Sequence, residues 1–357
     1  MKVGILTSGG DCQSLNATMR GLAITLYNNI KDVEIIGFLY GYKGLMYEDY
    51  KIMKPEDFSD IINIGGTILK TSRCPFKKMR IIENGFNKVE AMKKTYKKLN
   101  LDCLVVLGGN GSLKSANMLA QEGLNVIGLP KTIDNDTWGT DYTFGFQSAI
   151  DIATNYIDQI RTTAASHSRV FIIEIMGHKV GHICLSAGIA SGADIILIPE
   201  IPYDIEKIAD TIKQRQANGQ QYTIIACAEG AISKNDALLN KKHYKLKVAA
   251  REGLSVVHEI ANKLQNYIDS EIRIACPGHV QRGGNPCPYD RTIATRFGVE
   301  GAKLIMDKNY GKLVVLKNNS VTFIPLEESA GKLKYVDPYG EDVSSARLRQ
   351  SVSSSRV

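Results

Sequence analysis

The feature that most constrains the fold of this chain is a set of short apolar runs that alternate with helical patterns. Residues 103–107 and 195–199 are apolar at almost every position, without the alternation expected of a strand that has one solvent-facing side. Residues 15–27 and 87–98 carry the spacing of amphipathic helices. Continuous strands separated by helices predict an α/β fold with mostly parallel sheets covered on both faces.

The same pattern runs through both halves of the chain. At roughly 100–200 residues per domain, a length of 357 residues favours two domains. The polar tail from Glu341 onward is expected to be a frayed end. The expected strands are 3–7, 33–39, 103–107, 126–129, 170–175, 195–199, 222–227 and 272–276, and the expected helices are 15–27, 87–98, 113–122, 148–162, 205–216, 254–267 and 292–307.

Composition excludes several classes of function. The net charge is +7, but the basic residues are spread out, whereas a nucleic-acid surface needs a dense basic stripe. No apolar run approaches the ~20 residues of a membrane span, and the first residues lack a signal-peptide layout, so we expect a cytoplasmic protein. The seven cysteines are scattered and should be free thiols. His178 and His182 have no carboxylate at ligand spacing, which disfavours zinc.

Two glycine-rich junctions follow expected strands and precede expected helices. They are Ser-Gly-Gly-Asp at 8–11 and Gly-Gly-Asn-Gly-Ser at 108–112. Glycine lets backbone N–H groups approach an anion, and a helix N-terminus adds favourable partial charge. Neither junction fits the dinucleotide or Walker A pattern, and either could be no more than a tight turn. Together they indicate a polyphosphate ligand beyond the carboxyl ends of the strands.

A third junction carries acidic residues. Asp134 and Asp136 flank Asn135 directly after a strand, and Lys131 precedes them. Phosphoryl transfer to an alcohol needs a carboxylate to accept the hydroxyl proton and a cation to neutralise the transferred group. The alternative is an Asx-rich turn, which the same residue types favour.

A basic set lies in the second half. Arg169 follows Ser-His-Ser, and Arg273 precedes the string Gly-His-Val-Gln-Arg-Gly-Gly at 278–284, which contains Arg282. Guanidinium groups bind phosphate in a bidentate manner, so these positions indicate a phosphate-binding turn, although a structural salt bridge is the alternative for each arginine.

Taken together, these strings resemble the 6-phosphofructokinase family over residues 3 to about 298. The matching strings are GILTSGGD, LNATMRG, GGTIL, SRCP, LGGNGS, GLPKTIDND, GTDYTFGF, AASHSRVFIIEIMG, GADIILIPE, PGHVQRGG and PCPYDR. The resemblance implies transfer of a phosphoryl group to the C1 hydroxyl of fructose 6-phosphate, with Mg²⁺, in glycolysis. It also implies two doubly wound, Rossmann-like domains with the active site in the cleft between them.

The resemblance further assigns domains and residues. It implies a donor-binding domain of 1–145 plus about 281–331 and a fructose-6-phosphate-binding domain of 146–280 plus about 332–357. Family members are usually homotetramers, with the residues at Arg169 and Arg273 supplied by the neighbouring subunit, so at least a homodimer is expected. The implied catalytic residues are Asp134 as general base with Lys131, Thr132 and Asp136, the last a possible metal ligand. The implied donor-binding residues are Gly10, Arg73, Cys74, Gly108, Gly109, Asn110, Gly111 and Ser112. The implied sugar-binding residues are Thr132, Asp134, Arg169, Met176, Gly177, His178, Glu229, Arg273, His279 and Arg282.

The phosphoryl donor depends on two positions. Gly111 leaves room for the α-phosphate of a nucleotide where an Asp would block it, whereas Lys131 is typical of pyrophosphate enzymes. The combination resembles the branch that uses ATP or both donors, with pyrophosphate as the alternative.

Several positions depart from the family pattern. Asn110 stands where the family usually has a Mg²⁺-associated Asp, and His178 stands where Arg is common. These departures leave open a non-catalytic sugar-phosphate-binding homologue, whereas lipid and nicotinamide-nucleotide kinases lack the PGHVQRGG string. At the effector positions, Arg20 and Arg161 match basic residues of the regulated enzymes, but other cations of that pocket are replaced. We therefore expect weak or absent control by phosphorylated effectors. The replacing residues are Ile24, Pro55 and Gln220.

Overall fold

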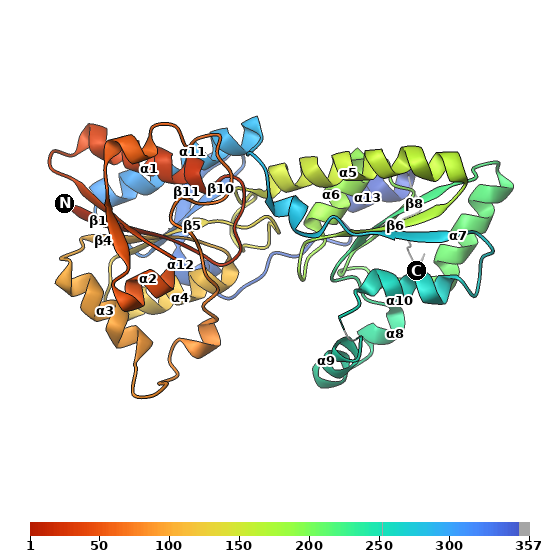
Figure 1. Ribbon diagram of the computed structural model, residues 1–357, viewed down its shortest axis with the longest axis horizontal. Helices are drawn as coiled ribbons and strands as arrows, with labels where there is room; N and C mark the ends of the chain where they lie inside the picture. The colour runs from red at the N-terminus through yellow and green to blue at the C-terminus, as the bar shows by residue number, and fades with distance from the viewer. Residues whose placement is uncertain (252, 350–357) are drawn as a thin grey trace. The chain divides into compact units, whose positions relative to one another are not determined.

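The computed structural model describes residues 1–251 and 253–349, and these residues form two compact units (Figure 1). Unit 1 comprises Met1–Ser148 and Arg282–Lys334. Unit 2 comprises Ala149–Gln281 and the described residues from Tyr335 onward. The chain therefore passes from one unit to the other three times, and each unit contains its own sheet.

Unit 1 contains a seven-stranded sheet in the order β11-β10-β5-β4-β1-β2-β3. The central strands are parallel, as the apolar runs predict, and only the pairs β2–β3 and β10–β11 at the two edges are antiparallel. The edge strands β3, β10 and β11 were not predicted. The bounds are β1 (Lys2–Ser8), β2 (Glu34–Phe38), β3 (Tyr50–Met53), β4 (Cys103–Gly108), β5 (Val126–Pro130), β10 (Lys312–Lys317) and β11 (Ser320–Pro325).

Helices cover both faces of this sheet (Figure 1). On one face α1 (Leu15–Asn29) packs closely on α11 (Pro288–Met306), because a Cβ at Gly298 would lie 2.2 Å from the carbonyl oxygen of Thr18 and only glycine allows that approach. The helices on the other face are α2 (Tyr42–Tyr47), α3 (Lys88–Lys98), α4 (Asn110–Gln121) and α12 (Leu326–Ser329). Two short 3₁₀ helices, η1 (Pro55–Phe58) and η2 (Phe76–Lys78), lie in the loops.

Unit 2 is built on a four-stranded, fully parallel sheet in the order β7-β8-β6-β9. One face packs on α7 and α10 in an apolar core, and α5, α6 and α13 lie on the other face (Figure 1). The strands are β6 (Val170–Ile175), β7 (Ile195–Leu197), β8 (Thr223–Ala228) and β9 (Ile272–Ala275), and η3 (Gly278–Arg282) follows β9. The helices are α5 (Phe146–His167), α6 (His182–Ala190), α7 (Ile205–Ala217), α10 (Val256–Leu264) and α13 (Glu341–Arg349).

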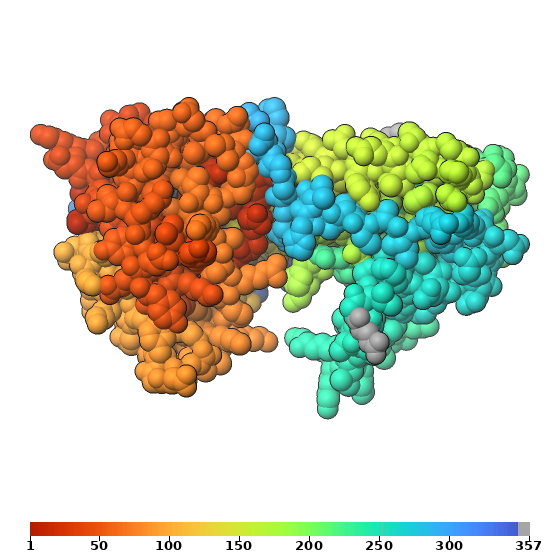
Figure 2. Space-filling model, viewed as in Figure 1, coloured from red at the N-terminus to blue at the C-terminus, as the bar shows by residue number. Residues whose placement is uncertain are grey.

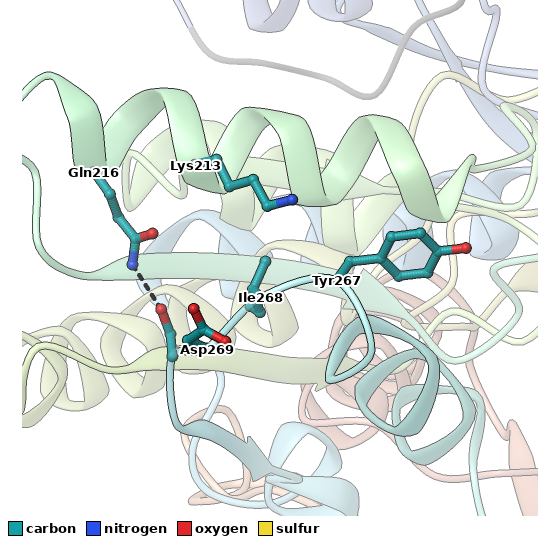
Figure 3. A pocket seen from close by; sticks show the side chains of 6 residues that line it. Lys213, Gln216, Tyr267, Ile268 and Asp269 are labelled. Atoms are coloured by element: carbon teal, nitrogen blue, oxygen red, sulfur yellow. Dashed lines mark hydrogen bonds between the residues drawn. The ribbon is translucent and has the colours of Figure 1, made fainter.

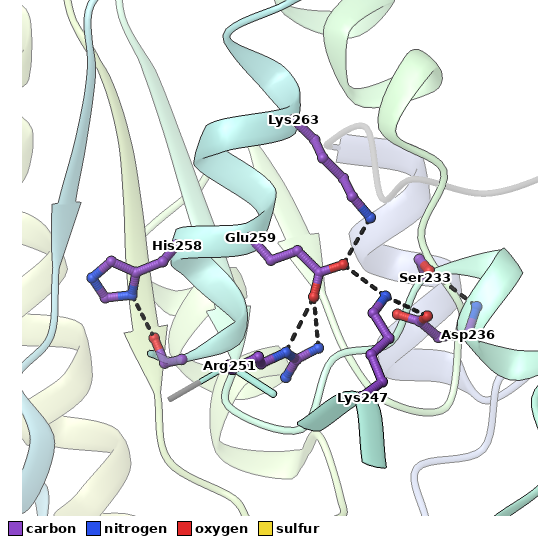
Figure 4. A network of polar contacts seen from close by, with 8 residues as sticks. Ser233, Asp236, Lys247, Arg251, His258, Glu259 and Lys263 are labelled. Atoms are coloured by element: carbon purple, nitrogen blue, oxygen red, sulfur yellow. Dashed lines mark hydrogen bonds and ion pairs between the residues drawn. The ribbon is translucent and has the colours of Figure 1, made fainter. Parts of the chain in front are cut away.

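Two further helices, α8 (Lys234–Ala237) and α9 (Lys241–Ala249), project from the body of unit 2 (Figures 1 and 2). Because α9 buries none of its side chains, an ion cluster around Glu259 supplies its attachment to α10. Glu259 accepts hydrogen bonds from Lys247 (2.8 Å), Lys263 (2.7 Å) and Arg251 (2.8 Å) (Figure 4). Burial alone would raise the pKa of Glu259, but the hydrogen bonds from Lys247 and Lys263 and their charges lower it to about 2.

Two expectations were wrong, and one helix of unit 2 was missed. Helix α4 begins at Asn110 rather than at residue 113, so the second glycine-rich junction is largely the first turn of a helix. Helix α6 was not predicted, because its sequence is apolar on all sides and shows no amphipathic period. The polar tail is not frayed over 341–349, because Val343 and Ala346 of α13 are buried; residues 350–357 lie outside the described residues. Within the described residues, no helix is long and apolar enough to cross a membrane.

Candidate active site

The three junctions singled out in the sequence start from one row of paired residues in unit 1. Strands β5, β4 and β1 are neighbours and parallel, so their carboxyl ends lie at the same edge of the sheet. Ser8 at the end of β1 pairs with Gly108 at the end of β4, and Gly108 pairs with Pro130 at the end of β5. The loops that follow therefore lie side by side, at the edge where ligands of open α/β sheets bind.

Two cations converge on the loop after β1. Gly9 takes a φ of +92°, which glycine adopts without strain. Lys131 Nζ donates a hydrogen bond to the carbonyl of Gly10, and Arg282 Nη1 donates one to the carbonyl of Asp11 at 3.2 Å. A Cβ at Gly10 would lie 2.6 Å from Arg282 Nη1, so glycine is what allows the guanidinium to lie against the loop. Burial lowers the pKa of Lys131.

The loop after β4 ends at once in a helix. Gly109 caps α4, and Asn110, Gly111 and Ser112 form its first turn, where backbone N–H groups have no partner within the helix. A Cβ added at Gly111 would meet no heavy atom within 4 Å, so the side of the helix at Gly111 is open. The first turn of α4 can therefore receive an anion, as a helix N-terminus does.

Asn110 has a partner that explains its departure from the family pattern. Its amide nitrogen donates a hydrogen bond to the carbonyl of Lys332, in the segment 331–334 that ends unit 1. A carboxylate has no proton to donate and would be repelled by that carbonyl oxygen. Asn110 is thus a tether between α4 and the segment 331–334, with one amide oxygen left for other contacts.

The loop after β5 is closed by the side chain of Asn135. This residue takes a φ of 54°, its Oδ1 accepts from the backbone N–H of Thr143 at 3.1 Å, and its Nδ2 donates to the carbonyl of Asp141 at 3.3 Å. Thr132 Oγ1 accepts from the N–H of Asp134 at 3.1 Å. Asn135 therefore closes the loop by bonds to residues six and eight positions further on, and the short turn within the loop is formed by Thr132. None of these bonds uses the side chains of the flanking carboxylates.

The carboxyl group of Asp136 is buried and perturbed. Burial, and then the nearby charge of Asp134, raise its pKa to about 6. Its Oδ1 is buried and has no hydrogen-bond partner within the described residues. Lys334 lies at the same loop: its N–H donates to the carbonyl of Asp136, and its Nζ donates to the carbonyls of Thr140 and Asp141, each at 2.9 Å. Burial lowers the pKa of Lys334 to about 8.

The buried carboxylate of Asp290, in α11, accepts hydrogen bonds from the segment that follows this loop. Asp290 accepts hydrogen bonds from Tyr142 Oη (2.9 Å), the N–H of Gly145 (2.9 Å) and both the N–H (2.8 Å) and Oγ (2.6 Å) of Ser148. It is fully buried, and burial raises its pKa although these donors oppose the rise. Asp290 is therefore a structural anchor.

Arg73 and Cys74 lie beside the first loop. The N–H of Gly9 donates to the carbonyl of Ser72 at 3.1 Å, which brings this segment to the end of β1. Arg73 is exposed and Cys74 is half-buried. The structure thus brings Arg73 and Cys74 to the loop that holds Gly10.

The sugar-site residues predicted in unit 2 form two separate groups. Met176, Gly177 and His178 follow β6, and Glu229 follows the neighbouring β8. Glu229 Oε1 accepts from the N–H groups of Gly177 (3.1 Å) and His178 (2.6 Å), so these residues form one cluster.

Gln281 joins the segment of His279 to this cluster. It is buried, its Oε1 accepts from the N–H of Met176 at 3.1 Å, and its Nε2 donates to the carbonyl of Gly278 at 3.2 Å. Gln281 was not predicted as a site residue, although it lies within the PGHVQRGG string.

Arg169 and Arg273 form the second group, at the opposite end of the same sheet. Arg169 directly precedes β6, whereas Met176 directly follows it, and the six residues of β6 span about 20 Å. Arg273 lies close to Arg169, because it pairs across β6 and β9 with Phe171, which is two residues after Arg169. One chain therefore does not bring the arginine pair to the cluster of Met176 and Glu229.

A hollow of about 310 Å³ lies near the arginine pair and contains none of the predicted residues (Figure 3). It lies between the end of α7 and the segment before β9, where Gln216 donates a hydrogen bond to Ser270 at 2.6 Å. Its lining includes Lys213, Tyr267 and Asp269. Among residues 1–251 and 253–349, no group of three or more His, Cys, Asp or Glu side chains could hold a metal ion by itself.

Comparison with known proteins identifies the family. The family model described as phosphofructokinase matches residues 2–305, which is most of the chain. The chain belongs to the phosphofructokinase family. This confirms the resemblance read from the sequence, and with it the expected α/β architecture.

Curated relatives of this phosphofructokinase-family chain extend over nearly its full length. It is 50% identical over 348 residues to an ATP-dependent 6-phosphofructokinase of Spirochaeta thermophila, covering 96% of this chain and 95% of that protein. It is 41% identical over 358 residues to ATP-dependent 6-phosphofructokinase 2 of Clostridium perfringens, covering 97% and 96%.

Solved structures of the family share the fold. The phosphofructokinase of Saccharomyces cerevisiae matches with a TM-score of 0.78 and 29% identity, covering 92% of this chain and 45% of that one. A pyrophosphate-dependent phosphofructokinase of Nitrosospira multiformis matches with a TM-score of 0.81, covering 96% of this chain and 87% of that one. Its identity of 19% means that this match shows the fold alone.

Proposed function

We propose that this chain transfers the γ-phosphoryl group of ATP to the C1 hydroxyl of fructose 6-phosphate, giving fructose 1,6-bisphosphate in glycolysis in the cytoplasm. The observation that carries the proposal is the row of three adjacent strand ends in unit 1, which brings two glycine-rich loops, two cations and two carboxylates to one edge. The 50% identity to an ATP-dependent 6-phosphofructokinase over 96% of the chain supports the same activity.

In this proposal unit 1 binds the donor. The phosphates of ATP lie along the Gly10 loop and the first turn of α4, whose N–H groups have no partner within the helix and whose partial positive charge favours anions. Lys131, with its ammonium on the carbonyl of Gly10, supplies cationic charge where negative charge develops. Arg282, which the resemblance gives to the sugar phosphate, donates a hydrogen bond to the carbonyl of Asp11 and so adds its charge at the same loop. The open side of Gly111 gives room for the nucleotide part of ATP.

Asp134 is the proposed general base, and Thr132 and Asp136 are its neighbours in the same loop. Asp134 accepts the proton of the C1 hydroxyl as that oxygen attacks the terminal phosphorus atom. The donor set suits Mg²⁺, because the unpartnered carboxylate oxygen of Asp136 is the hard ligand that this ion prefers. Asp136 would hold the ion together with donor phosphates, and bound Mg²⁺ would neutralise charge on those phosphates. Asn110 offers at most its amide oxygen.

Unit 2 binds the sugar in this proposal. Met176, Gly177 and Glu229 contact the sugar, His178 lies beside them, and His279 approaches from the segment that Gln281 holds. Arg169 and Arg273 bind the 6-phosphate of the site in a neighbouring subunit, because one chain keeps them about 20 Å from Met176. The active enzyme is therefore a homodimer or homotetramer.

Pyrophosphate is the second candidate donor. The buried ammonium of Lys131 lies on the Gly10 loop and is the residue type found in pyrophosphate enzymes. The small Gly111 and the names of the relatives favour ATP.

A coupled assay tests the proposal. The enzyme is incubated with fructose 6-phosphate and Mg²⁺ together with ATP or with pyrophosphate, and fructose 1,6-bisphosphate is measured. We expect kcat/KM to be higher with ATP. A higher value with pyrophosphate would reverse the choice of donor, and no product with either donor would refute the kinase activity.

A further inference from the structure

The carboxylate of Glu271 bridges two arginines of unit 2: Arg169, which directly precedes β6, and Arg273, which lies in β9. Glu271 Oε2 forms an ion pair with Arg169 Nε, and Glu271 Oε1 forms one with Arg273 Nη2. Each oxygen of a single carboxylate is thus occupied by a different guanidinium group. The side chain of Glu271 is 45% exposed, so it can swing into solvent without disturbing the core.

The two guanidinium groups are the groups that the proposed function gives to a phosphate monoester. Guanidinium groups bind carboxylate and phosphate with the same paired geometry, so Glu271 satisfies the donors that a phosphate would use. The pKa of Glu271 is lowered, chiefly by its hydrogen bond with Arg169, so the carboxylate is ionised at neutral pH. With Glu271 in place, the arginine pair presents a net charge of about one rather than two.

We propose that Glu271 is an internal competitor for the arginine pair and sets the affinity of the enzyme for fructose 6-phosphate. This inference rests on the proposed function, because it assigns Arg169 and Arg273 to the 6-phosphate. A phosphate dianion and the Glu271 carboxylate repel each other, so they do not share the pair, and binding requires Glu271 to leave. Exposed ion pairs are weak, which allows the phosphate to displace it.

The opposite role would be positioning, in which Glu271 holds the two guanidinium groups ready for phosphate. The two roles predict opposite signs. Removal of a competitor tightens binding, whereas removal of a positioning group weakens it. A gain in affinity also cannot come from damage to the fold, so the sign separates competition from a merely structural effect.

The experiment compares Glu271→Gln with the parent enzyme, both as full-length protein. Glutamine keeps the shape and one acceptor oxygen but removes the negative charge. We expect the KM and the calorimetric Kd for fructose 6-phosphate to fall about 3- to 10-fold, as removal of one charge near a partly screened site predicts, with the gain in KM and Kd rather than in kcat.

Asp269→Asn is the matched control. It makes the same change of charge two residues away, on a carboxylate that forms no ion pair within the described residues. We expect less than a twofold change in either constant. An equal fall in this control would show a general charge effect and overturn the inference.

An unchanged or raised Kd in Glu271→Gln would also overturn the inference. The proposed function is judged separately, from turnover of the parent enzyme with ATP. If the parent binds fructose 6-phosphate without turnover, the ratio of the two Kd values still decides the role of Glu271. If the parent neither binds nor converts the sugar phosphate, both proposals are wrong.

Discussion

Replacement of the buried Lys131 by Met should make the protein more stable and less active. Lys131 is 3% exposed, and burial lowers its pKa from the ordinary 10.5. The folded protein therefore holds the ammonium proton of Lys131 less tightly than the unfolded chain does. The charge of Lys131 thus lowers the free energy of unfolding at pH 7, and stability rises with pH as Lys131 loses its proton. Methionine fills similar space without a charge.

The size of the stability change follows from two opposing contributions. Lys131→Met removes the buried charge but also the hydrogen bond to the carbonyl of Gly10. Gly10 is only half-buried, so water can replace that bond at little cost. We expect a gain of about 1 kcal/mol, within the range of single stabilising substitutions. For a unit of roughly 200 residues this raises Tm by about 2–4 °C.

The change in activity has the opposite sign. In the proposed function the ammonium of Lys131 stabilises negative charge on the transferred phosphoryl group. Loss of one such preorganised group costs about 10²- to 10³-fold in kcat. Stability and activity should therefore move in opposite directions, as expected for a charge kept for function.

The assay combines thermal unfolding at pH 7 with steady-state turnover of ATP and fructose 6-phosphate. Lys97→Met, a change at an exposed lysine of α3, is the matched control and should alter neither quantity. A Tm lowered by several degrees in Lys131→Met would refute the argument about the buried charge. A kcat within threefold of the parent would refute the role of Lys131 in transfer.

Three further predictions concern the donor loops and the ion cluster. Gly111→Asp should fold normally, because the position is open, but lower kcat/KM for ATP about 10- to 100-fold through repulsion of the phosphates; equal values for Gly111→Asp and Gly111→Ser would contradict this. Asn110→Asp should break the tether to Lys332 and speed amide hydrogen exchange at 332–334, and exchange like that of the parent would show that no tether exists. The pKa of Glu259 in the folded protein is about 2, so its contribution to stability is present above the unfolded pKa near 4.5 and is lost as the pH falls from about 5 to 2. Limited proteolysis should therefore cut within α9 more readily at pH 3 than at pH 6. Glu259→Gln should abolish this difference.

The parallel strands could be predicted because the physical cause is local. A strand buried on both faces must be mostly apolar; β4 and β5 are apolar throughout, and β1 is apolar from Val3 to Leu6. The edge hairpin β10–β11 could not be predicted in this way, since its outer strand is half-exposed and its turn depends on two asparagines, Asn318 and Asn319, with positive φ.

The loops of the site could be located from glycine and Asx residues at strand ends, but their supports could not. Asp290 reaches Gly145 across 145 positions in the sequence, and Asn110 reaches Lys332 across 222. No local pattern marks such pairs, because each residue alone is also common on helix surfaces. The start of α4 was missed for a related reason: Asn, Gly and Ser favour a loop unless the strand end and the cap at Gly109 fix the helix.

The separation of Arg169 and Arg273 from Met176 also needed the structure. The sequence groups all three with the sugar, and only the direction of β6 shows that the arginines lie at its other end. This geometry is why the proposed enzyme needs a second subunit.

The central claim is that Asp134 takes the proton of the C1 hydroxyl. The most direct test is the kcat of Asp134→Asn for fructose 1,6-bisphosphate formation from ATP, together with the calorimetric Kd for fructose 6-phosphate. We predict that kcat falls by about 10²- to 10⁴-fold while Kd changes less than threefold. A kcat within tenfold of the parent enzyme would contradict the role of Asp134 as general base.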